Sequence, residues 1–345
     1  MENREIKKTD PGFSRQRSLD EQKGADWERK TPLLQTIGLQ KYFKLQGGSR
    51  LHAVDGIDLT LNPGETLGVV GESGCGKSTL GRTILKLIQP TGGKILYDGK
   101  DITSYSNRQM HPRRREMQII FQDPYSSIDP RKSVIEAIAE YMSIHKTYRN
   151  KNDSFKRAAE LMDMVGLARR YTNSYPHELD GGRRQRIGIA RALSLNPRFI
   201  VCDEPVSALD VSIQAQIINL LNDLQEKNNL TYLFISHDLS VVEHISDAVG
   251  VMYLGNLVEY GAKEDIFRNP LHPYTEALFS AIPVPDPTVK MKRIVLEGSI
   301  PSPANPPSGC KFHTRCVHCT ERCKVEEPVQ KEIEPGHFVA CHKYD

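Results

Sequence analysis

The sequence predicts an α/β fold built around a largely parallel sheet, and two observations support this. From residue 33 to about residue 283, short apolar runs alternate with amphipathic segments, which is typical of a sheet covered by helices. Three strand-like runs, at 66–70, 199–202 and 231–235, lead directly into polar motifs. Because ligands of parallel α/β sheets bind beyond the carboxyl ends of the strands, we expect the three motifs to form one site.

The composition is that of a globular chain without a strong charge bias. Hydrophobic residues make up 38% of the 345 residues, and 46 basic side chains are nearly balanced by 43 acidic ones. This balance argues against nucleic-acid binding through bulk charge. No run approaches the roughly 18 apolar residues of a membrane-spanning helix, and the start of the chain lacks the apolar segment of a signal peptide. We therefore expect any membrane role to depend on a partner.

Both ends of the chain differ in composition from its main body. Residues 1–32 are dominated by charged and small polar side chains, which predicts a flexible extension. Residues 283–309 are rich in proline and predict a connector, and five of the seven cysteines follow it. Because the chain shows no export signal, metal binding is a better interpretation of these cysteines than disulfide formation.

The first motif fits the phosphate-binding pattern G-x-x-x-x-G-K-[ST]. Glycines let the loop backbone turn its N–H groups toward phosphate oxygens, and the helix that follows adds its positive N-terminus. We expect Lys77 to reach the β- and γ-phosphates and the Ser78 hydroxyl to ligate Mg²⁺. An ordinary glycine-rich turn is the alternative, but a strand before the loop and a helix after it favour a nucleoside triphosphate. The predicted nucleotide-binding residues here are Gly71, Glu72, Ser73, Gly74, Cys75, Gly76, Lys77, Ser78 and Thr79.

The other motifs supply catalytic candidates. Asp203 and Glu204 end the second strand, where Asp203 suits a water-mediated hold on Mg²⁺ and Glu204 suits polarising the attacking water. His237 follows the third strand and suits a γ-phosphate contact. Gln122 follows the run 119–121 and could touch both the metal and the water. A structural acidic turn or a structural histidine would give the same local patterns, so each signal depends on the phosphate loop.

A further segment makes the assignment more specific. Residues 179–193 (LDGGRRQRIGIARAL) resemble the LSGGQ signature of ABC ATPases, and residues 207–210 (SALD) resemble their D-loop. The resemblance covers about residues 33–265 and implies a P-loop NTPase with a RecA-like core, an antiparallel β subdomain before the phosphate loop, and a helical subdomain at about 123–180. It also implies that Phe43, or its neighbour Tyr42, stacks on adenine, although either ring could instead pack in the core.

The same resemblance implies how the chain works. Two such subunits clamp ATP between the phosphate loop of one and the signature of the other. Closure on ATP and reopening after hydrolysis would then drive transmembrane partners. The groove between the glutamine loop and the helical subdomain is where a coupling helix of the membrane partner would dock.

The tail resembles the C-terminal extension of oligopeptide/dipeptide importer ATPases. The similar segments are 272–278 (HPYTEAL), 280–287 (SAIPVPDP), 309–316 (GCKFHTRC) and 336–342 (GHFVACH), within an extension expected at 266–345. This resemblance implies ATP-driven peptide import at the cytoplasmic face of the membrane, with two transmembrane permeases, an extracytoplasmic peptide-binding protein and no nucleic acid. Nickel and glutathione importers share much of the pattern, so their cargoes are alternatives.

In that group, Cys310, Cys316, Cys323 and Cys341 match positions that can hold a [4Fe–4S] cluster. Four thiolates are what such a cluster needs, although the spacing is not that of a ferredoxin. Zn²⁺ on four cysteines is the main alternative, and unligated thiols are another. Cys319 has no counterpart in the pattern and could substitute for a neighbour. In each case with a metal, we expect a small closed site that fixes the tail and takes no part in catalysis.

The signature departs from the family pattern at two positions, with Asp180 in place of serine and Arg183 in place of glutamine. A carboxylate only accepts hydrogen bonds and repels a nearby phosphate, so the ATP site that this signature completes should hydrolyse slowly. We therefore hypothesise a heterodimer with a second ATPase subunit and one weak site. An ion pair between Arg183 and Asp180 would weaken this argument.

Three rival functions remain at this point. A non-transport ABC ATPase of translation or DNA repair usually carries two cassettes or a long coiled-coil insertion, and each motif here occurs once. An exporter cassette is often fused to membrane spans, and none is apparent here. A metal-sensing regulator would use the cysteine-rich tail as its functional part.

Overall fold

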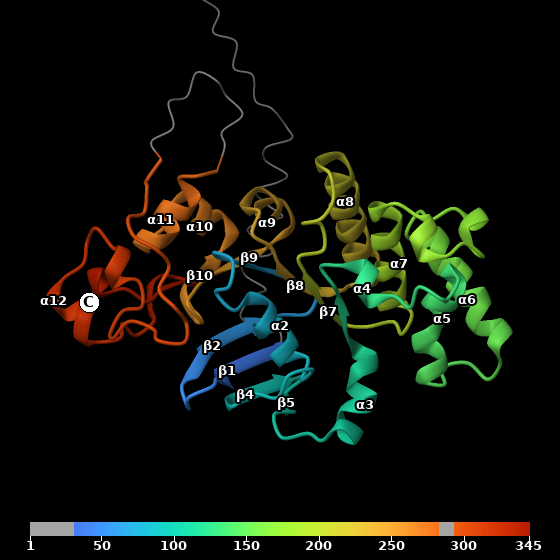
Figure 1. Cartoon of the computed structure of the whole chain (residues 1–345), viewed down its shortest axis with the longest axis horizontal. Coiled ribbons are helices and arrows are strands. Elements are labelled where there is room, and N and C mark those ends of the chain that lie inside the picture. The colour runs from blue at the N-terminus through green and yellow to red at the C-terminus, as the bar shows by residue number, and fades with distance from the viewer. Residues whose placement is uncertain (1–30, 283–292) are drawn as a thin grey trace, which may run out of the picture.

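The computed structural model describes residues 31–282 and 293–345 and places two sheets beside each other (Figure 1). The smaller sheet is antiparallel, and β1 pairs with both β2 and β4. Two of its strands follow the phosphate loop along the chain, so the antiparallel subdomain is not confined to the residues before the loop. Its strand order is β2 (Arg50–Leu61), β1 (Leu34–Lys44), β4 (Gly92–Tyr97) and β5 (Lys100–Asp101).

The larger sheet has a parallel centre, as the sequence predicts. Strands β9, β3, β8, β7 and β6 are parallel neighbours. Every residue of β3, β7, β8 and β9 is buried, which is typical of a parallel sheet covered on both faces. The strand order is β11 (Lys331–Glu334), β12 (His337–Val339), β10 (Asn256–Ala262), β9 (Ala248–Tyr253), β3 (Thr66–Val70), β8 (Thr231–Ile235), β7 (Phe199–Asp203) and β6 (Met117–Ile120). The predicted strands 66–70 and 231–235 are confirmed, and the third runs one residue further, to Asp203.

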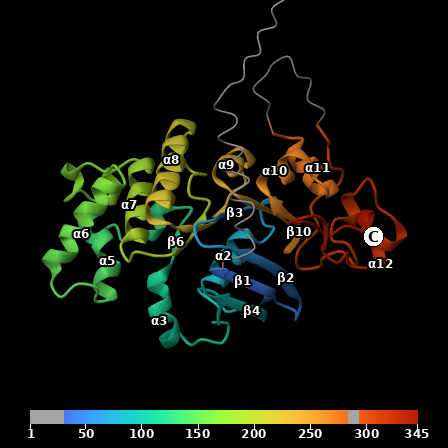
Figure 2. The ribbon, with the colours of Figure 1, turned by 180° about the vertical axis from the view of Figure 1, so that it is seen from behind.

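Helices surround the large sheet and form a separate group at one end. In Figure 1 the helices α5, α6 and α7 lie on the right, opposite the C-terminal segment, and Figure 2 shows the same separation from behind. These three helices pack on one another, and polar residues cap each start: Ser133, Asn150 and Asp180. The helices are α2 (Lys77–Ile84), α3 (Asn107–Glu116), α4 (Pro124–Ser127), α5 (Val134–Ile144), α6 (Lys151–Met164), α7 (Gly181–Leu193), α8 (Val211–Asn228), α9 (Leu239–Ile245), α10 (Lys263–Arg268), α11 (Pro273–Phe279) and α12 (Glu321–Val325).

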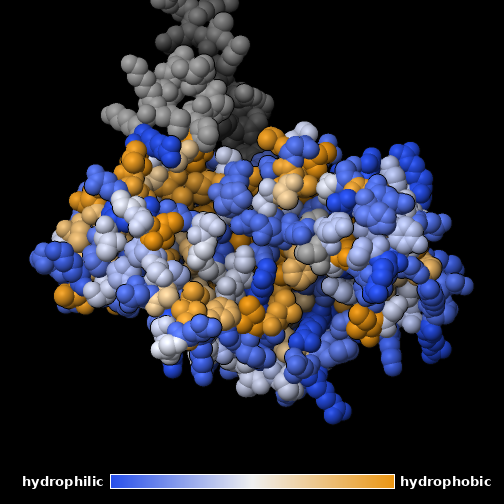
Figure 3. Space-filling view, in the orientation of Figure 1, coloured by the Kyte–Doolittle hydropathy of each residue, from blue (hydrophilic) through white to orange (hydrophobic). Residues whose placement is uncertain are grey.

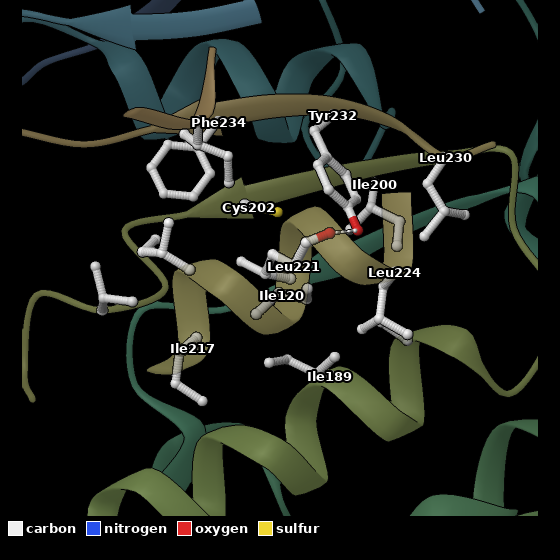
Figure 4. Close-up of a cluster of buried hydrophobic side chains, with 14 of the residues drawn as sticks. Ile120, Ile189, Ile200, Cys202, Ile217, Leu221, Leu224, Leu230, Tyr232 and Phe234 are labelled. Carbon is white, nitrogen blue, oxygen red and sulfur yellow. Dashed lines mark hydrogen bonds between the residues drawn. The ribbon is translucent and has the colours of Figure 1, made fainter. Parts of the chain in front are cut away.

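A continuous apolar core joins the sheet to this helical group (Figure 4). Ile189 of α7 and Leu221 of α8 lie opposite Ile200 and Tyr232 of the sheet, and all four side chains are almost fully buried. The Tyr232 hydroxyl donates to the Leu221 carbonyl at 3.1 Å, so the polar end of this ring is also satisfied. Burial of each side chain of this size contributes about 1.5–3 kcal/mol. The strand ends that form the site are therefore held on a rigid base.

The C-terminal segment is built into the large sheet. Strand β12 pairs antiparallel with β10, and β11 pairs with β12. Beneath this junction the fully buried Glu259 carboxylate accepts hydrogen bonds from the backbone N–H groups of Leu271 and His272, at 2.7 and 2.9 Å, and lies 2.8 Å from His337 Nε2. The tail therefore extends the sheet beyond the predicted connector.

Several expectations concern parts of the chain with no further structural detail. The predicted flexible extension falls almost wholly on residues 1–30, and part of the connector falls on 283–292, both outside the described residues.

Among the described helices, none has the length and apolarity to span a membrane. The face in Figure 3 is largely hydrophilic with separate hydrophobic patches, so hydropathy alone does not single out a docking surface on it.

Candidate nucleotide site

The phosphate loop connects β3 to α2, and its glycines are required for two reasons. Gly71, Gly74 and Gly76 have φ values of 148°, 80° and 109°, which side chains disfavour. A Cβ atom on Gly76 would lie 1.9 Å from the Ala53 carbonyl oxygen, and one on Gly71 would lie 2.2 Å from that of Met252. The loop therefore needs glycine both for its turns and for its close packing against β2 and β9. Only the first reason follows from the motif.

Lys77 is the first residue of α2 and lies against the loop. Its side chain is 5% exposed, and Nζ donates to the carbonyl oxygens of Gly71 at 2.7 Å and Glu72 at 3.1 Å. The ammonium group is thus fixed by the same loop whose N–H groups are expected to bind phosphate. This geometry suits a lysine that reaches the β- and γ-phosphates of a bound nucleotide.

A cavity of about 510 Å³ opens beside the loop and contains most of the predicted site residues. Its walls come from the small sheet, the loop, three strand ends and one residue of the tail. Among the predicted residues, Gly71, Glu72, Cys75, Asp203 and Phe43 are not part of its lining. The lining residues are Leu51, Ala53, Ser73, Gly74, Gly76, Lys77, Ser78, Thr79, Gln122, Glu204, His237 and Pro303.

The three predicted catalytic residues meet at one point of this cavity. Gln122 Nε2 donates to Glu204 Oε2 at 2.9 Å, and His237 Nδ1 lies 3.3 Å from the same oxygen. Glu204 has φ of 50°, a left-handed conformation that costs energy in a residue with a side chain and often marks functional sites. The carboxylate is therefore aimed at the cavity from a constrained backbone, between two polar side chains.

Asp203 is fully buried, and only one of its two carboxylate oxygens has a hydrogen-bond partner among the described residues. Its Oδ2 accepts a hydrogen bond from Arg82 Nη2 at 3.1 Å, while Oδ1 has no hydrogen-bond partner among the described residues. A buried carboxylate oxygen without a partner is costly, so it fits a role in holding a metal-bound water. Arg82 was not predicted. It lies four residues after Ser78 on α2, so helical spacing is the signal that could have found it.

The predicted adenine contact is not visible in the cavity. Phe43 is half-buried and packs beneath the ammonium group of Lys41, at 4.8 Å from the ring centroid. Tyr42 stacks on His52 at 4.2 Å between centroids and hydrogen-bonds to Asp55. The role of Phe43 in binding adenine stays a prediction.

The signature lies in a different cavity from the phosphate loop. Asp180 caps α7 by accepting from the Arg183 backbone N–H at 2.8 Å, and its other oxygen pairs with the Arg183 guanidinium. Arg170, Arg183 and Arg186 line this second cavity, of about 320 Å³. One chain therefore does not bring its own signature to its own phosphate loop. The ion pair that would weaken the asymmetry argument is present.

Comparison with known proteins agrees with this architecture. Residues 54–207 match the ABC transporter family, and residues 258–323 match the C-terminal region of oligopeptide/dipeptide transporters. The chain is 53% identical to the oligopeptide transport ATP-binding protein AppF of Bacillus subtilis, over 90% of this chain and 97% of that protein. It belongs to the ABC transporter ATPases. The expected fold class is confirmed, and the chain is an ATP-hydrolysing transporter subunit.

Two further comparisons support the assignment of this ABC ATPase. The dipeptide transport ATP-binding protein DppF of Haemophilus influenzae is 47% identical over 91% of this chain and 98% of its own length. The solved dimeric structure of the ATP-binding cassette MJ0796, bound to ADP and Pi, has a TM-score of 0.61 at 28% identity. The structural match covers 67% of this chain and 98% of the MJ0796 chain.

The tail cysteines of this ABC ATPase line a small cavity. Cys310, Cys316, Cys323 and Cys341 surround about 200 Å³ together with four histidines, and Cys319 is not part of the lining. All seven cysteines are free, and the described residues contain no group of three or more His, Cys, Asp or Glu side chains placed to hold a metal ion. Burial raises the pKa of Cys310 to about 11, so binding a metal there would have to displace a proton.

Proposed function

We propose that this ABC ATPase powers peptide uptake at the cytoplasmic face of a membrane. One observation carries the proposal: a single chain combines the ABC cassette with the oligopeptide/dipeptide extension and spans nearly the full length of relatives named for oligopeptide and dipeptide transport. Its partners are two transmembrane permeases and an extracytoplasmic peptide-binding protein. Nickel and glutathione remain alternative cargoes of the same machinery.

The site geometry supports a division of roles within this function. The loop backbone and Lys77 bind the β- and γ-phosphates of ATP. Ser78 and Gln122 would ligate Mg²⁺, with Asp203 acting through water. Glu204 orients the attacking water and His237 contacts the γ-phosphate. Both side chains line the cavity, and His237 Nδ1 lies 3.3 Å from Glu204 Oε2.

The test is ATP hydrolysis by the transporter reconstituted in vesicles with its permeases and binding protein. We expect di- or oligopeptides to stimulate hydrolysis and to accumulate inside the compartment that carries the ATPase. Ni²⁺ and glutathione serve as competing cargoes. Stimulation by either of these, without a response to peptides, would contradict the peptide assignment but leave the ATPase intact.

We also propose that the second ATPase subunit is a different chain. The Asp180–Arg183 pair is about half exposed, so solvent limits how far Arg183 neutralises the carboxylate. More importantly, a carboxylate cannot donate the hydrogen bond that a serine hydroxyl supplies. The ATP site completed by this signature is therefore the weak one, and a partner with an LSGGQ signature completes the strong one.

Asp180→Ser in the assembled transporter is expected to raise ATP hydrolysis by up to about twofold, because a second site then turns over. Asp163→Ser is a matched control, since Asp163 forms a similarly exposed ion pair with Arg169 and neither residue lines the signature cavity. Hydrolysis is measured as phosphate release at saturating ATP. An unchanged rate in Asp180→Ser would count against the asymmetry.

For the tail we propose a [4Fe–4S] cluster in preference to Zn²⁺. Zinc needs four ligands at about 2.0–2.3 Å from one point, whereas each thiolate of a cluster binds a separate iron atom. Four cysteines that surround one cavity supply the four separate thiolates that a cluster requires. Cys310, Cys316, Cys323 and Cys341 would hold the group, which would fix the tail.

The chain purified without oxygen is expected to contain about four iron atoms and to absorb visible light. Cys323→Ser is expected to lose the iron, and the control Cys319→Ser to keep it, because Cys319 lies outside the cavity lining. A colourless, iron-free wild-type chain, or zinc in place of iron, would exclude the cluster.

A further inference from the structure

The C-terminal tail reaches back to the phosphate loop and holds one residue of it. Glu72, the second residue of the loop, is bound through all three of its polar groups. Its N–H donates to the Tyr274 hydroxyl at 2.9 Å, and its carbonyl accepts from Lys77 Nζ at 3.1 Å. Its carboxylate accepts two hydrogen bonds from Arg315, at 2.8 and 3.2 Å. Tyr274 and Arg315 belong to the tail.

Arg315 is held rigidly in this position. Its side chain is only 7% exposed, and its guanidinium lies 6.0 Å from the centroid of the Tyr253 ring. Nearby, Phe312 is 1% exposed and packs against both Tyr253 and Tyr274. A guanidinium removed from water in this way needs a charged partner, and the paired hydrogen bonds to Glu72 supply it. The Arg315 side of the contact is therefore buried, while the Glu72 side chain is 24% exposed.

A second contact joins the tail to strand β2 beside the nucleotide cavity. The Pro303 carbonyl accepts a hydrogen bond from the His52 backbone N–H at 3.0 Å, and Pro303 itself lines the cavity. His52 belongs to β2, whose Leu51 and Ala53 line the same wall. The tail thus contacts the nucleotide site both at the phosphate loop and at β2.

The charge on Glu72 gives the Arg315 contact a functional meaning. A carboxylate within a loop that binds phosphates repels them, and this repulsion is strong in a partly buried site. Arg315 compensates that charge and fixes the loop residue that carries it. We propose that Arg315 is a positioning residue of the ATP site, which raises the affinity of the phosphate loop for ATP by neutralising and anchoring Glu72. The proposal goes beyond peptide import and rests only on ATP binding.

The experiment measures the dissociation constant of Mg-ATP for the full chain by titration. Arg315→Gln is expected to weaken ATP binding by about fivefold to tenfold, because the negative charge of Glu72 is then uncompensated within the phosphate loop. The double variant Glu72→Gln/Arg315→Gln removes both charges and is expected to recover most of the affinity. A purely structural role for Arg315 would not produce this recovery.

Two further variants complete the test. Arg322→Gln is a control for the loss of an arginine from the tail, because Arg322 forms ion pairs with Glu326 and Asp345 but none with the loop. It is expected to bind ATP as the wild type does. Arg315→Lys keeps the positive charge, and its affinity for ATP is expected to fall by less than about threefold. This variant replaces Arg315→Gln in the test if Arg315→Gln does not fold.

Three results would overturn the proposal. The first is wild-type affinity in Arg315→Gln. The second is a double variant as weak as Arg315→Gln, which would assign the loss to general damage of the tail. The third is a tenfold loss in Arg315→Lys or in the Arg322→Gln control. Failure of the wild-type chain to bind ATP would instead contradict the assignment of the nucleotide site itself.

Discussion

Glu204→Gln is expected to leave ATP binding intact and to lower ATP hydrolysis by about 10²–10⁴-fold, the range for removal of a general base. The substitution preserves size and the hydrogen bond to Gln122 but removes the negative charge that polarises water. The Glu204 side chain is 16% exposed, and both Gln122 and His237 approach the same carboxylate oxygen. No other described carboxylate lines this cavity, so none is in place to replace Glu204. ATP binding and phosphate release, measured on the same preparation, separate the two effects.

The control for this variant is Glu226→Gln, an exposed glutamate on α8 outside the cavity. It is expected to hydrolyse ATP at the wild-type rate. Near-normal hydrolysis in Glu204→Gln would show that another group activates the water, and the assignment of catalytic roles at the strand ends would have to be abandoned.

Lys77→Ala is expected to produce the other large effect, a loss of ATP affinity of about 100-fold. Lys77 is the cation at the start of α2 that is fixed against the phosphate loop, and alanine cannot replace its charge. In Lys77→Ala we expect hydrolysis to be lost because ATP no longer binds, whereas Glu204→Gln should lose hydrolysis while still binding ATP. The two variants therefore distinguish a binding defect from a chemical one.

The sequence predicts which catalytic candidates gather beside the phosphate loop because each motif is a local signal. The phosphate loop carries its own mechanism in nine consecutive residues, and strand ends in a parallel sheet meet at one edge. That reasoning correctly brings Gln122, Glu204 and His237 together although they are far apart in the chain. The helical group after Gln122 and the strands of the large sheet follow from the same regular patterns.

The contacts that the sequence does not predict are those without a local pattern. The clearest example is Arg315, which meets Glu72 across 243 residues. A single arginine in a charged tail has no periodicity or spacing that marks it. Strand β12 spans three residues, too few for alternation to show, so the sequence could not place the tail in the sheet.

The signature illustrates an intermediate case. Asp180 and Arg183 are three residues apart at the start of a helix, a spacing that allows the ion pair to be foreseen. What the sequence could not give is the exposure of that pair. Because the pair is half exposed, the lost hydroxyl donor, and not the added charge, becomes the main reason to expect a weak site.

The most direct test of the central claim, that the loop beginning at Gly71 binds the phosphates of ATP, is a Mg-ATP titration of Lys77→Ala beside Lys86→Ala. Lys86 is an equally buried lysine that donates to two backbone carbonyls, those of Thr103 and Tyr105, outside the cavity. The account predicts that Lys77→Ala loses ATP affinity by about 100-fold while Lys86→Ala retains it. Equal affinity in Lys77→Ala and the wild type would contradict the account.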